Sequence, residues 1–323
     1  VVYWTLSETQ QYRRHGGSEL QHSSQSLALA CMGSSQLVTG RLDGSVTTCS
    51  LTQFEGSVEL CTFPRTSRSG IAALAARSKS MLAAGTFDGA IEIWDTEQHT
   101  ARMLCSIDES DGSEHQLTEH VGGASEKIVR ALLWISDLEQ DWLVSASFDK
   151  TITVWMIASA DNFMRRHQNF MRSHQKFIDQ DCAFCARHSI AHRGAVTVLA
   201  LVGARGSERS PVIASGSQDC TIKLWDFRTG VALATIRHHS QAESSGVCSL
   251  AWIPQPMLDP ESADNQKGWL VSGRGDNTIV AHDLRSKRMI TTFHGLEVES
   301  KGWLVSGSAD NTVRTWRVRT RES

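Results

Sequence analysis

The sequence is poor in proline and tyrosine and has no long apolar segment. Of its 323 residues only 5 are proline and 2 are tyrosine, whereas 24 are glycine and 10 are tryptophan. No apolar run approaches the ~20 residues that a membrane-spanning helix needs. No charged segment followed by an apolar one opens the sequence, so we expect neither a membrane span nor a signal peptide.

The sequence also lacks a strong net charge and a disulfide pattern. Its 32 Lys and Arg nearly balance its 35 Asp and Glu, leaving a net charge of -3. Overall charge therefore does not favour nucleic acid or an anionic membrane as a partner. The 8 cysteines are scattered apart from Cys182 and Cys185, unlike the framework of a small secreted protein. We expect an intracellular chain, in the cytoplasm or the nucleus.

The dominant pattern is a short repeat. An apolar run is followed by small residues, an Asp and an alternating segment that ends six residues after the Asp, usually in Trp. The clearest copy covers residues 212–226. Six such pairs occur in the same register: Asp43 with Cys49, Asp88 with Trp94, Asp149 with Trp155, Asp219 with Trp225, Asp276 with His282, and Asp310 with Trp316.

Each repeat predicts a β-hairpin with further strands on either side. The Asp and the residue after it are typical of a tight reversal, and the segments around them alternate with a period of two. Together with an apolar segment upstream and a looser one downstream, each unit has four short strands. One such sheet is too small to be stable alone, so successive units are expected to pack face to face into a ring.

These repeats resemble WD40 repeats. The Trp-Asp ending stands at Trp94-Asp95 and at Trp225-Asp226. The resemblance implies an all-β propeller and a hydrogen-bonded set within a blade, best matched by His192, Ser215 (or Ser217), Asp219 and Trp225. We interpret this set as structural, because it satisfies buried polar groups. The same role is expected of the equivalent residues in other copies: Asp88, Trp94, Asp149, Trp155, Asp310 and Trp316.

The expected architecture is one propeller over residues 1–323 with six or seven blades, of which the last is incomplete. The N-terminal strands, which begin in the middle of a unit, are candidates to complete that last blade. The predicted units are a partial blade at 1–20 and blades at about 25–62, 70–107, 128–165, 193–238, 246–294 and 300–319.

Residues 157–192 are expected to form an insertion outside the blades. They contain a tandem heptad in which Phe163, Phe170 and Phe177 recur at seven, so these residues could share one face of a helix. Basic residues surround them, which makes a docking helix or an RNA contact possible. The simpler interpretation, which we favour, is a surface insertion that packs its Phe residues onto the propeller.

The end of this insertion contains a weak zinc pattern. Cys182, Cys185, His188 and His192 could supply four tetrahedral ligands. The gap before His188 is too short for an ordinary zinc finger, and His192 already belongs to the blade pattern. We therefore expect no metal and no other cofactor, and interpret these residues as incidental.

The resemblance also implies where a partner would bind. The residue before each turn Asp can line the upper face around the central channel of a propeller. At this face we expect apolar anchors and polar residues: Leu42, Phe87, Phe148 and Gln218, with Arg41 and Arg274 beside them, and Gly275 and Ala309 in the last two copies. Alternatively, both Phe residues simply pack between neighbouring blades.

The most direct functional prediction is a protein-interaction scaffold or adaptor that works within a multiprotein complex. Its partners are other proteins. Two alternatives are an RNA-binding propeller that uses the basic segment 160–180 and a substrate-recruiting subunit of a ubiquitin ligase. No catalytic residues are expected, because the sequence has no nucleophile elbow, phosphate-binding loop or zinc-protease motif. We therefore predict that the chain is not an enzyme.

Overall fold

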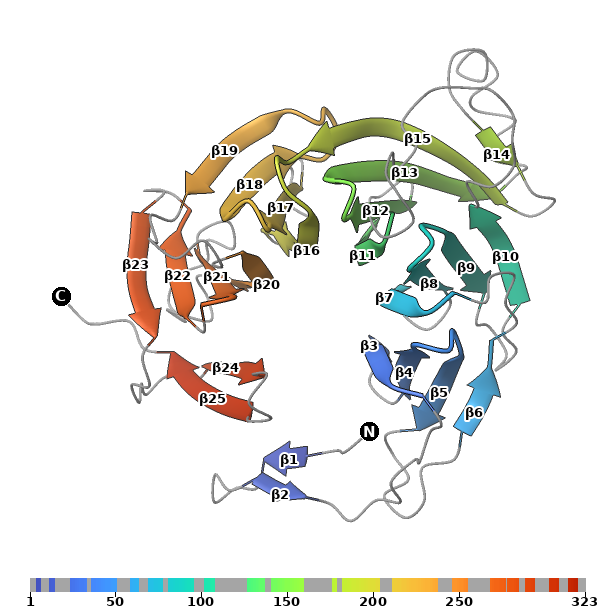
Figure 1. Cartoon of the computed structure of the whole chain (residues 1–323), viewed down its shortest axis with the longest axis horizontal. Helices are drawn as coiled ribbons and strands as arrows, with labels where there is room; N and C mark the ends of the chain where they lie inside the picture. Colours follow the sequence, from blue (N-terminus) through green and yellow to red (C-terminus); the bar gives the residue numbers. More distant parts are fainter. Residues whose placement is uncertain are drawn as a thin grey trace. The chain divides into compact units, whose positions relative to one another are not determined.

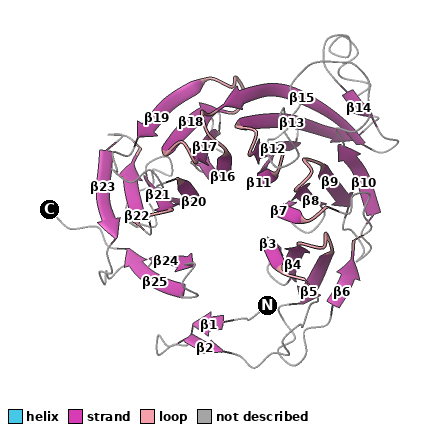
Figure 2. Ribbon diagram, in the orientation of Figure 1, coloured by secondary structure: helices cyan, strands magenta, loops and turns pink. Residues whose placement is uncertain are grey.

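The fold is known here from a computed structural model. It describes residues 4–6, 12–14, 24–33, 36–50, 59–63, 69–77, 81–95, 102–107, 127–136, 141–159, 176–178, 182–203, 211–237, 246–254, 268–276, 278–284, 288–293, 302–307 and 313–318. All regular structure in these residues is β-strand, as Figure 2 shows. Within the same residues no helix is long and apolar enough to cross a bilayer. The predicted all-β class is confirmed.

The chain divides into two compact units. Unit 1 comprises Val1–Asp149 and Thr153–Arg187, and unit 2 comprises Lys150–Ile152 and His188–Ser323. The prediction that residues 1–323 form a single ring, with blades at the boundaries given above, stays a prediction.

Unit 1 contains two four-stranded sheets, one two-stranded sheet and most of a five-stranded sheet. In the four-stranded sheets the strands follow one another in chain order and pair antiparallel. The strands are β3 (Ser26–Met32), β4 (Gln36–Arg41), β5 (Val46–Ser50) and β6 (Glu59–Thr62), then β7 (Ile71–Arg77), β8 (Met81–Thr86), β9 (Ile91–Asp95) and β10 (Arg102–Ile107), with β1 (Trp4–Leu6) paired to β2 (Tyr12–Arg14).

The next sheet corrects the prediction for residues 157–192. It has five strands in the order β11 (Val129–Ser136), β12 (Asp141–Ser147), β13 (Thr151–Ser159), β15 (Cys182–Ala191) and β14 (Lys176–Ile178). The predicted insertion thus supplies the outer strands of this sheet. In the sequence of β15, apolar residues are spaced by two or four positions, at Phe184, Ala186 and Ile190. This spacing fits the period of two that is typical of a strand. Phe177 lies in β14 rather than in a helix, and Phe163 and Phe170 lie outside the described residues.

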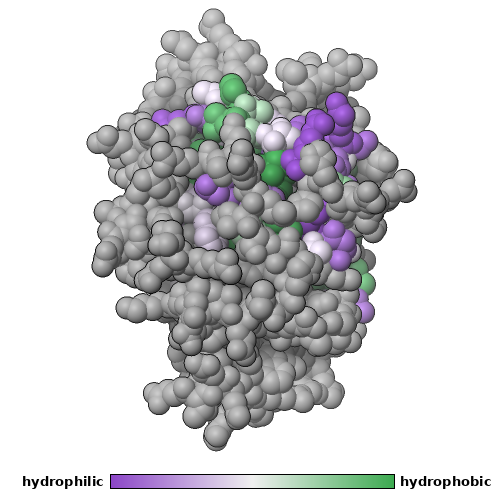
Figure 3. All heavy atoms as spheres, turned by 90° about the vertical axis from the view of Figure 1, so that its left-hand side faces the viewer, coloured by the Kyte–Doolittle hydropathy of each residue, from purple (hydrophilic) through white to green (hydrophobic). Residues whose placement is uncertain are grey.

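Unit 2 contains two further four-stranded antiparallel sheets and a two-stranded one. Their strands are β16 (Val196–Val202), β17 (Val212–Ser217), β18 (Thr221–Asp226) and β19 (Ala232–Arg237), then β20 (Val247–Pro254), β21 (Gly268–Arg274), β22 (Ile279–Asp283) and β23 (Arg288–Phe293), and finally β24 (Gly302–Gly307) and β25 (Val313–Val318). On the side shown in Figure 3, described hydrophilic and hydrophobic residues lie next to one another.

Within each unit the sheets stack face to face through apolar side chains. In unit 1, β3 packs against β7 and β7 against β11, and Figure 1 shows these sheets side by side. In unit 2, β16 packs against β20. One cluster joins Val38 and Val46 of one sheet to Leu82 and Trp94 of the next. Leu82 and Ala84, two positions apart in β8, both belong to this cluster, so burial of one apolar face by the hydrophobic effect drives the stacking that the repeat predicts.

Glycine in the second strand allows neighbouring sheets to approach closely. A methyl group on Gly85 would lie 2.5 Å from Val129 Cγ1, and one on Gly216 would lie 2.5 Å from Val247 Cγ1. Real side chains do not tolerate such contacts. At Gly85 and Gly216, packing between neighbouring sheets of one unit therefore requires glycine.

In four of the described turns the residue after the Asp is left-handed. Glycine takes this conformation in two copies, at Gly44 (φ 86°) and Gly89 (φ 99°), but two others use Lys150 (φ 78°) and Cys220 (φ 62°). A side chain makes the left-handed region less favourable by about 1 kcal/mol. These two hairpins therefore form despite a local backbone cost.

The first strand of each complete sheet contains a β-bulge. The pairing with the second strand shifts by one residue between Ser26 and Ala28, and it does so at the equivalent place in every other complete sheet. The bulged residues are Leu27, Ala72, Arg130, Thr197 and Cys248. A bulge turns one side chain out of the alternation of its strand. Here the bulged residue of the first strand is thereby placed at the same end of the sheet as the residue before the turn Asp.

Candidate interaction site

The residue before each turn Asp is held at the end of its sheet by one repeated backbone bond. Its N–H donates to the carbonyl of a residue that precedes the first strand of the same sheet. The bonds are Leu42 to Gln25 (2.9 Å), Phe87 to Gly70 (3.0 Å), Phe148 to Ile128 (3.1 Å), Gln218 to Ala195 (2.9 Å) and Gly275 to Gly246 (2.9 Å). We call these residues, together with the bulged residues, the pre-turn face of the unit to which they belong.

In unit 1 the pre-turn face is largely apolar. Leu42 is 50 % exposed, and Leu27 beside it is also exposed. Phe87 and Phe148 are half-buried. A methyl group on Gly70 would lie 2.7 Å from the Leu42 carbonyl oxygen and 3.0 Å from Phe87 Cδ2. Phe87 thus packs against the backbone that joins two sheets while part of the residue stays accessible. Its role in partner binding stays a prediction.

Arg130 is the one charged side chain among the bulged residues, and the sequence pattern did not identify it. Its side chain is exposed, and Nη1 donates to the Ala72 carbonyl of the neighbouring sheet at 3.0 Å. In the bulge that positions Arg130, two residues of the first strand lie opposite one residue of the second. The loose sequence pattern of the first strand does not reveal such a pairing.

In unit 2 the pre-turn face is polar and small. Gln218 and Gly275 are exposed, and so is the bulged Cys248. Thr197 is half-buried and donates through Oγ1 to the Gly216 carbonyl at 3.1 Å. The position of Ala309 lies outside the described residues. No large apolar side chain occupies a described position of this face, in contrast to unit 1.

Arg41 and Arg274 differ from their expected role as exposed polar anchors. Each is only 6 % exposed, at the same register position in its own sheet. Arg41 donates to Ser45 Oγ at 3.0 Å and to Thr47 Oγ1 at 2.6 Å. Arg274 Nη1 lies 3.5 Å from Asp276 Oδ2. Since both guanidinium groups point toward the hairpin of their own sheet, their contacts stabilise the turn.

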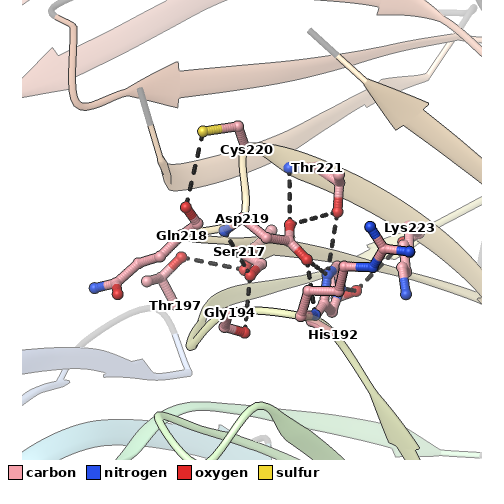
Figure 4. Close-up of polar contacts among 12 residues, drawn as sticks. His192, Gly194, Thr197, Ser217, Gln218, Asp219, Cys220, Thr221 and Lys223 are labelled. Carbon is pink, nitrogen blue, oxygen red and sulfur yellow. Dashed lines mark hydrogen bonds and ion pairs between the residues drawn. The ribbon is translucent and has the colours of Figure 1, made fainter. Parts of the chain in front are cut away.

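The predicted set around His192 lies together in unit 2, and Figure 4 shows His192 beside Asp219. His192 Nδ1 lies 3.2 Å from Asp219 Oδ2, and His192 Nε2 lies 2.7 Å from Ser215 Oγ. Trp225 Nε1 donates to the same Ser215 oxygen at 2.8 Å. These partners are satisfied by a neutral imidazole that donates from Nδ1 to the carboxylate and accepts at Nε2 from the hydroxyl.

Asp219 also organises the turn that contains it. Its Oδ2 accepts from the Arg193 N–H at 2.9 Å, and its Oδ1 accepts from the Thr221 hydroxyl at 2.6 Å and from the Thr221 N–H at 2.9 Å. One carboxylate thereby joins the β17–β18 turn to the segment before β16. Its position explains why this residue type recurs in the repeat.

Burial and these contacts shift the pKa values of both groups. Burial lowers the pKa of His192 below its usual 6.5, although the neighbouring Asp219 carboxylate opposes this shift. Burial alone would raise the pKa of Asp219, but the Thr221 hydroxyl, the Arg193 N–H and His192 outweigh it and lower the pKa to about 2. A neutral imidazole beside an ionised carboxylate is thus the stable state near neutral pH.

The five-stranded sheet repeats part of this arrangement, whereas the β7–β10 sheet is built differently. Trp155 Nε1 donates to Ser145 Oγ at 2.8 Å, and the Asp149 N–H donates to Ser147 Oγ at 3.1 Å. In the β7–β10 sheet Ala84 stands in place of Ser, and Trp94 packs edge-on against Phe63 with ring centroids 5.3 Å apart.

The remaining residues of the predicted structural set are Asp88, Asp310 and Trp316. Asp88 accepts a short hydrogen bond from the Thr86 hydroxyl. Asp310 lies outside the described residues, as does the side chain of Trp316, whose backbone belongs to β25. All of these described contacts lie within one sheet or between adjacent sheets of one unit.

The zinc pattern is not brought together by the fold. Cys182, Cys185 and His188 lie along the extended strand β15, where each residue advances about 3.3 Å. The Cα atoms of residues 182 and 188 are therefore about 20 Å apart. The ligand atoms of one zinc ion lie within about 5 Å of each other, a gap that these two side chains are too short to close. His192, the fourth candidate, is engaged by Asp219 and Ser215.

Comparison with known proteins identifies the repeats. The family described as "WD domain, G-beta repeat" matches residues 113–156, 184–226 and 299–317. The second of these segments contains His192, Ser215, Asp219 and Trp225, whose contacts are described above. The recognition of WD40 repeats from the Trp-Asp endings is thus confirmed.

Curated relatives match over parts of their length. Nuclear distribution protein nudF of Aspergillus niger is 26 % identical over 225 residues, which are 68 % of this chain and 40 % of the relative. THO complex subunit 6 of Homo sapiens is 34 % identical over 86 residues, which are 27 % of this chain and 23 % of the relative. Ribosome biogenesis protein YTM1 of Yarrowia lipolytica is 29 % identical over 163 residues, which cover 42 % of this chain and 30 % of the relative. The chain thus spans two fifths or less of each relative's length.

A solved structure supports the fold over nearly the whole chain. A chain in the crystal structure of a mitotic checkpoint complex superimposes with a TM-score of 0.64 at 18 % identity, covering 97 % of this chain and 82 % of the other. That chain is a WD40 propeller. The chain thus contains WD40 repeats, and the small antiparallel sheets of its described residues have the fold of a WD40 β-propeller.

Proposed function

We propose that this chain is a protein-interaction subunit that binds partner proteins through the pre-turn face of unit 1. The observation that carries the proposal is the apolar character of that face. Leu27 and Leu42 are exposed there, and Phe87 and Phe148 are half-buried. Aromatic residues are among the residue types that dominate the binding energy of protein interfaces. Here two partly exposed ones lie at the turn end of rigid sheets.

The relatives are consistent with this role. Their names include a subunit of the THO complex and a ribosome biogenesis protein, and the structural neighbour was solved as part of a mitotic checkpoint complex. WD40 propellers generally act as non-enzymatic scaffolds. The proposed role for this chain needs only binding, with the stacked sheets acting as a rigid support for the residues that make contact.

The test is affinity capture of partners from a cell extract with the full chain as bait. The double variant Phe87→Ala/Phe148→Ala should retain less than about a tenth of the partner protein captured by the wild type, since two aromatic anchors are removed. A control truncates two exposed apolar residues in unit 2. Val231→Ala/Leu233→Ala alters two exposed side chains on or beside β19.

The control variant should capture the same partners as the wild type, and both variants should melt within a few degrees of it. If the wild type captures no protein reproducibly, or if the two double variants lose partners equally, the proposal is wrong.

A further inference from the structure

Arg130 lies at the bulge of the sheet that carries Phe148, and its side chain reaches the neighbouring sheet, which carries Phe87. Phe87 is bonded through its N–H to Gly70, two residues before Ala72, and Phe148 is bonded to Ile128, two residues before Arg130. The guanidinium of Arg130 reaches from its own sheet to the Ala72 carbonyl at 3.0 Å. The exposed cation therefore bridges adjacent sheets, with one half-buried Phe on each.

The contact to Ala72 holds the guanidinium without neutralising it. A carbonyl acceptor engages an N–H donor but has no net charge, and a guanidinium presents five such donors in a planar fork. Its remaining donors can bind a further acceptor, and the acceptor whose geometry matches two parallel N–H groups is a carboxylate or a phosphate.

The charges around this point favour a single carboxylate over a polyanion. The turns beside Leu42 and Phe87 each carry an exposed carboxylate, at Asp43 and Asp88. The net charge of the chain is -3. RNA or a phosphorylated segment gains affinity from several cations acting together, whereas Arg130 is the one exposed guanidinium among the described residues of the pre-turn face of unit 1.

We propose that Phe87, Arg130 and Phe148 bind a partner segment in which an Asp or Glu lies between apolar residues. The carboxylate pairs with the Arg130 guanidinium, and the apolar residues pack on the two Phe rings. This proposal rests on the proposed function and deepens it, because it names the chemistry of the bound segment and the residue that selects it.

The test begins with a displayed library of random peptides, selected on the full wild-type chain. Selected sequences should be enriched in Asp or Glu between apolar residues. A fluorescent peptide made from the most enriched sequence should bind about tenfold more weakly when its acidic residue is replaced by the neutral amide. The variant Arg130→Gln should weaken the original peptide to the same extent and should no longer distinguish acid from amide.

A charge exchange separates recognition from a merely structural role. Arg130→Glu should reject the acidic peptide and should bind its counterpart in which the acidic residue is replaced by Arg. The matched control is Arg237→Gln, which removes an exposed guanidinium from β19 in unit 2. It should leave binding of the acidic peptide unchanged. Thermal melting of each variant verifies that it is folded.

Several results would overturn the inference. These are a library that yields no enriched peptide, enrichment that does not depend on Arg130, a phosphoserine peptide that binds more tightly than the acidic one through Arg130, or Arg130-dependent retention of single-stranded RNA. If Phe87→Ala/Phe148→Ala abolishes capture of cellular partners while Arg130→Gln does not alter it, the scaffold function stands and the carboxylate inference fails.

Discussion

The β16–β19 sheet of unit 2 and the β7–β10 sheet of unit 1 share one sequence register but hold their Trp residues in different ways. Trp225 donates to Ser215, which also bonds to His192 and through it to Asp219. The β7–β10 sheet has Ala84 where the other has Ser215, and its Trp94 is fully buried against Phe63. With Ala84 at this position Trp94 has no Ser hydroxyl there to donate to, and it packs against Phe63.

The difference shows which features the fold requires and which are optional. Both sheets keep the turn Asp and the Gly at which the next sheet approaches closely. Only the β16–β19 sheet is described with a buried His and a carboxylate whose pKa values are shifted. The close packing should therefore matter equally in both sheets, whereas polar substitutions and pH should act on the β16–β19 sheet.

The largest expected effect tests the shared feature. Gly85→Ala and Gly216→Ala should each destabilise the protein by about 3 kcal/mol, because the added methyl group must displace a buried Val of the next sheet. Chemical denaturation followed by Trp fluorescence measures this cost. Similar losses for the two variants support a common packing rule. A negligible cost at either site would contradict the close approach described for that sheet.

The next effect tests the polar network. Ser215→Ala should destabilise unit 2 by about 2 kcal/mol, because it leaves the buried Trp225 N–H and the His192 Nε2 without their shared partner. The reciprocal variant Ala84→Ser places a hydroxyl into the apolar arrangement of the β7–β10 sheet and should give no stabilisation. Hydrogen exchange resolved by peptide follows the two sheets separately. If Ala84→Ser stabilised the protein, the two arrangements would not be true alternatives.

The third effect is a dependence on pH. The pKa of Asp219 is about 2 in the folded chain against 3.8 unfolded, so its contribution of about 2 kcal/mol is complete above pH 4 and is lost as the pH falls toward 2. The lowered pKa of His192 acts in the same direction. The unfolded chain binds this proton first, so stability begins to fall as the pH drops below 6.5.

Urea denaturation at a series of pH values measures this dependence. The variant Asp219→Asn should lower stability at neutral pH and should remove the part of the dependence between pH 4 and 2. An unchanged pH profile in this variant would show that other groups cause the acid sensitivity.

The smallest effect concerns the turns. Cys220→Gly and Lys150→Gly should each stabilise the protein by about 1 kcal/mol, because both residues have positive φ angles that glycine adopts without strain. Gly89→Ala should have the opposite effect by a similar amount. Differences in melting temperature suffice to detect these changes. A destabilising Cys220→Gly would mean that the thiol contributes more than its backbone conformation costs.

Much of this architecture could be predicted from the repeat. The spacing between the Asp and the Trp six residues later requires a hairpin, since it keeps Asp219 at the reversal and Trp225 on the strand that follows. The grouping of His192, Ser215, Asp219 and Trp225 also followed from resemblance to the family, and the structure brings these four side chains together.

Other features could not be predicted, because they depend on contacts between strands distant in sequence. Residues 182–191 were interpreted as part of an insertion, but they form the fourth strand of a sheet whose third strand ends at Ser159. A looser outer strand has no obligatory turn or aromatic residue to mark it. Arg130 was missed because a bulge is a property of pairing between two strands and leaves no mark on one of them.

The sequence alone determined the unit of construction: a tight turn at an acidic residue, alternating strands and a small residue at each close approach. These features act over a few residues, where steric limits and hydrogen bonds leave little choice. Tertiary structure decided which side chains reach the surface. Arg41 and Arg130 have the same charge, yet one is buried against Thr47 and the other is exposed at a bulge. Burial depends on what packs above a residue, and neighbours far away in the chain supply those atoms.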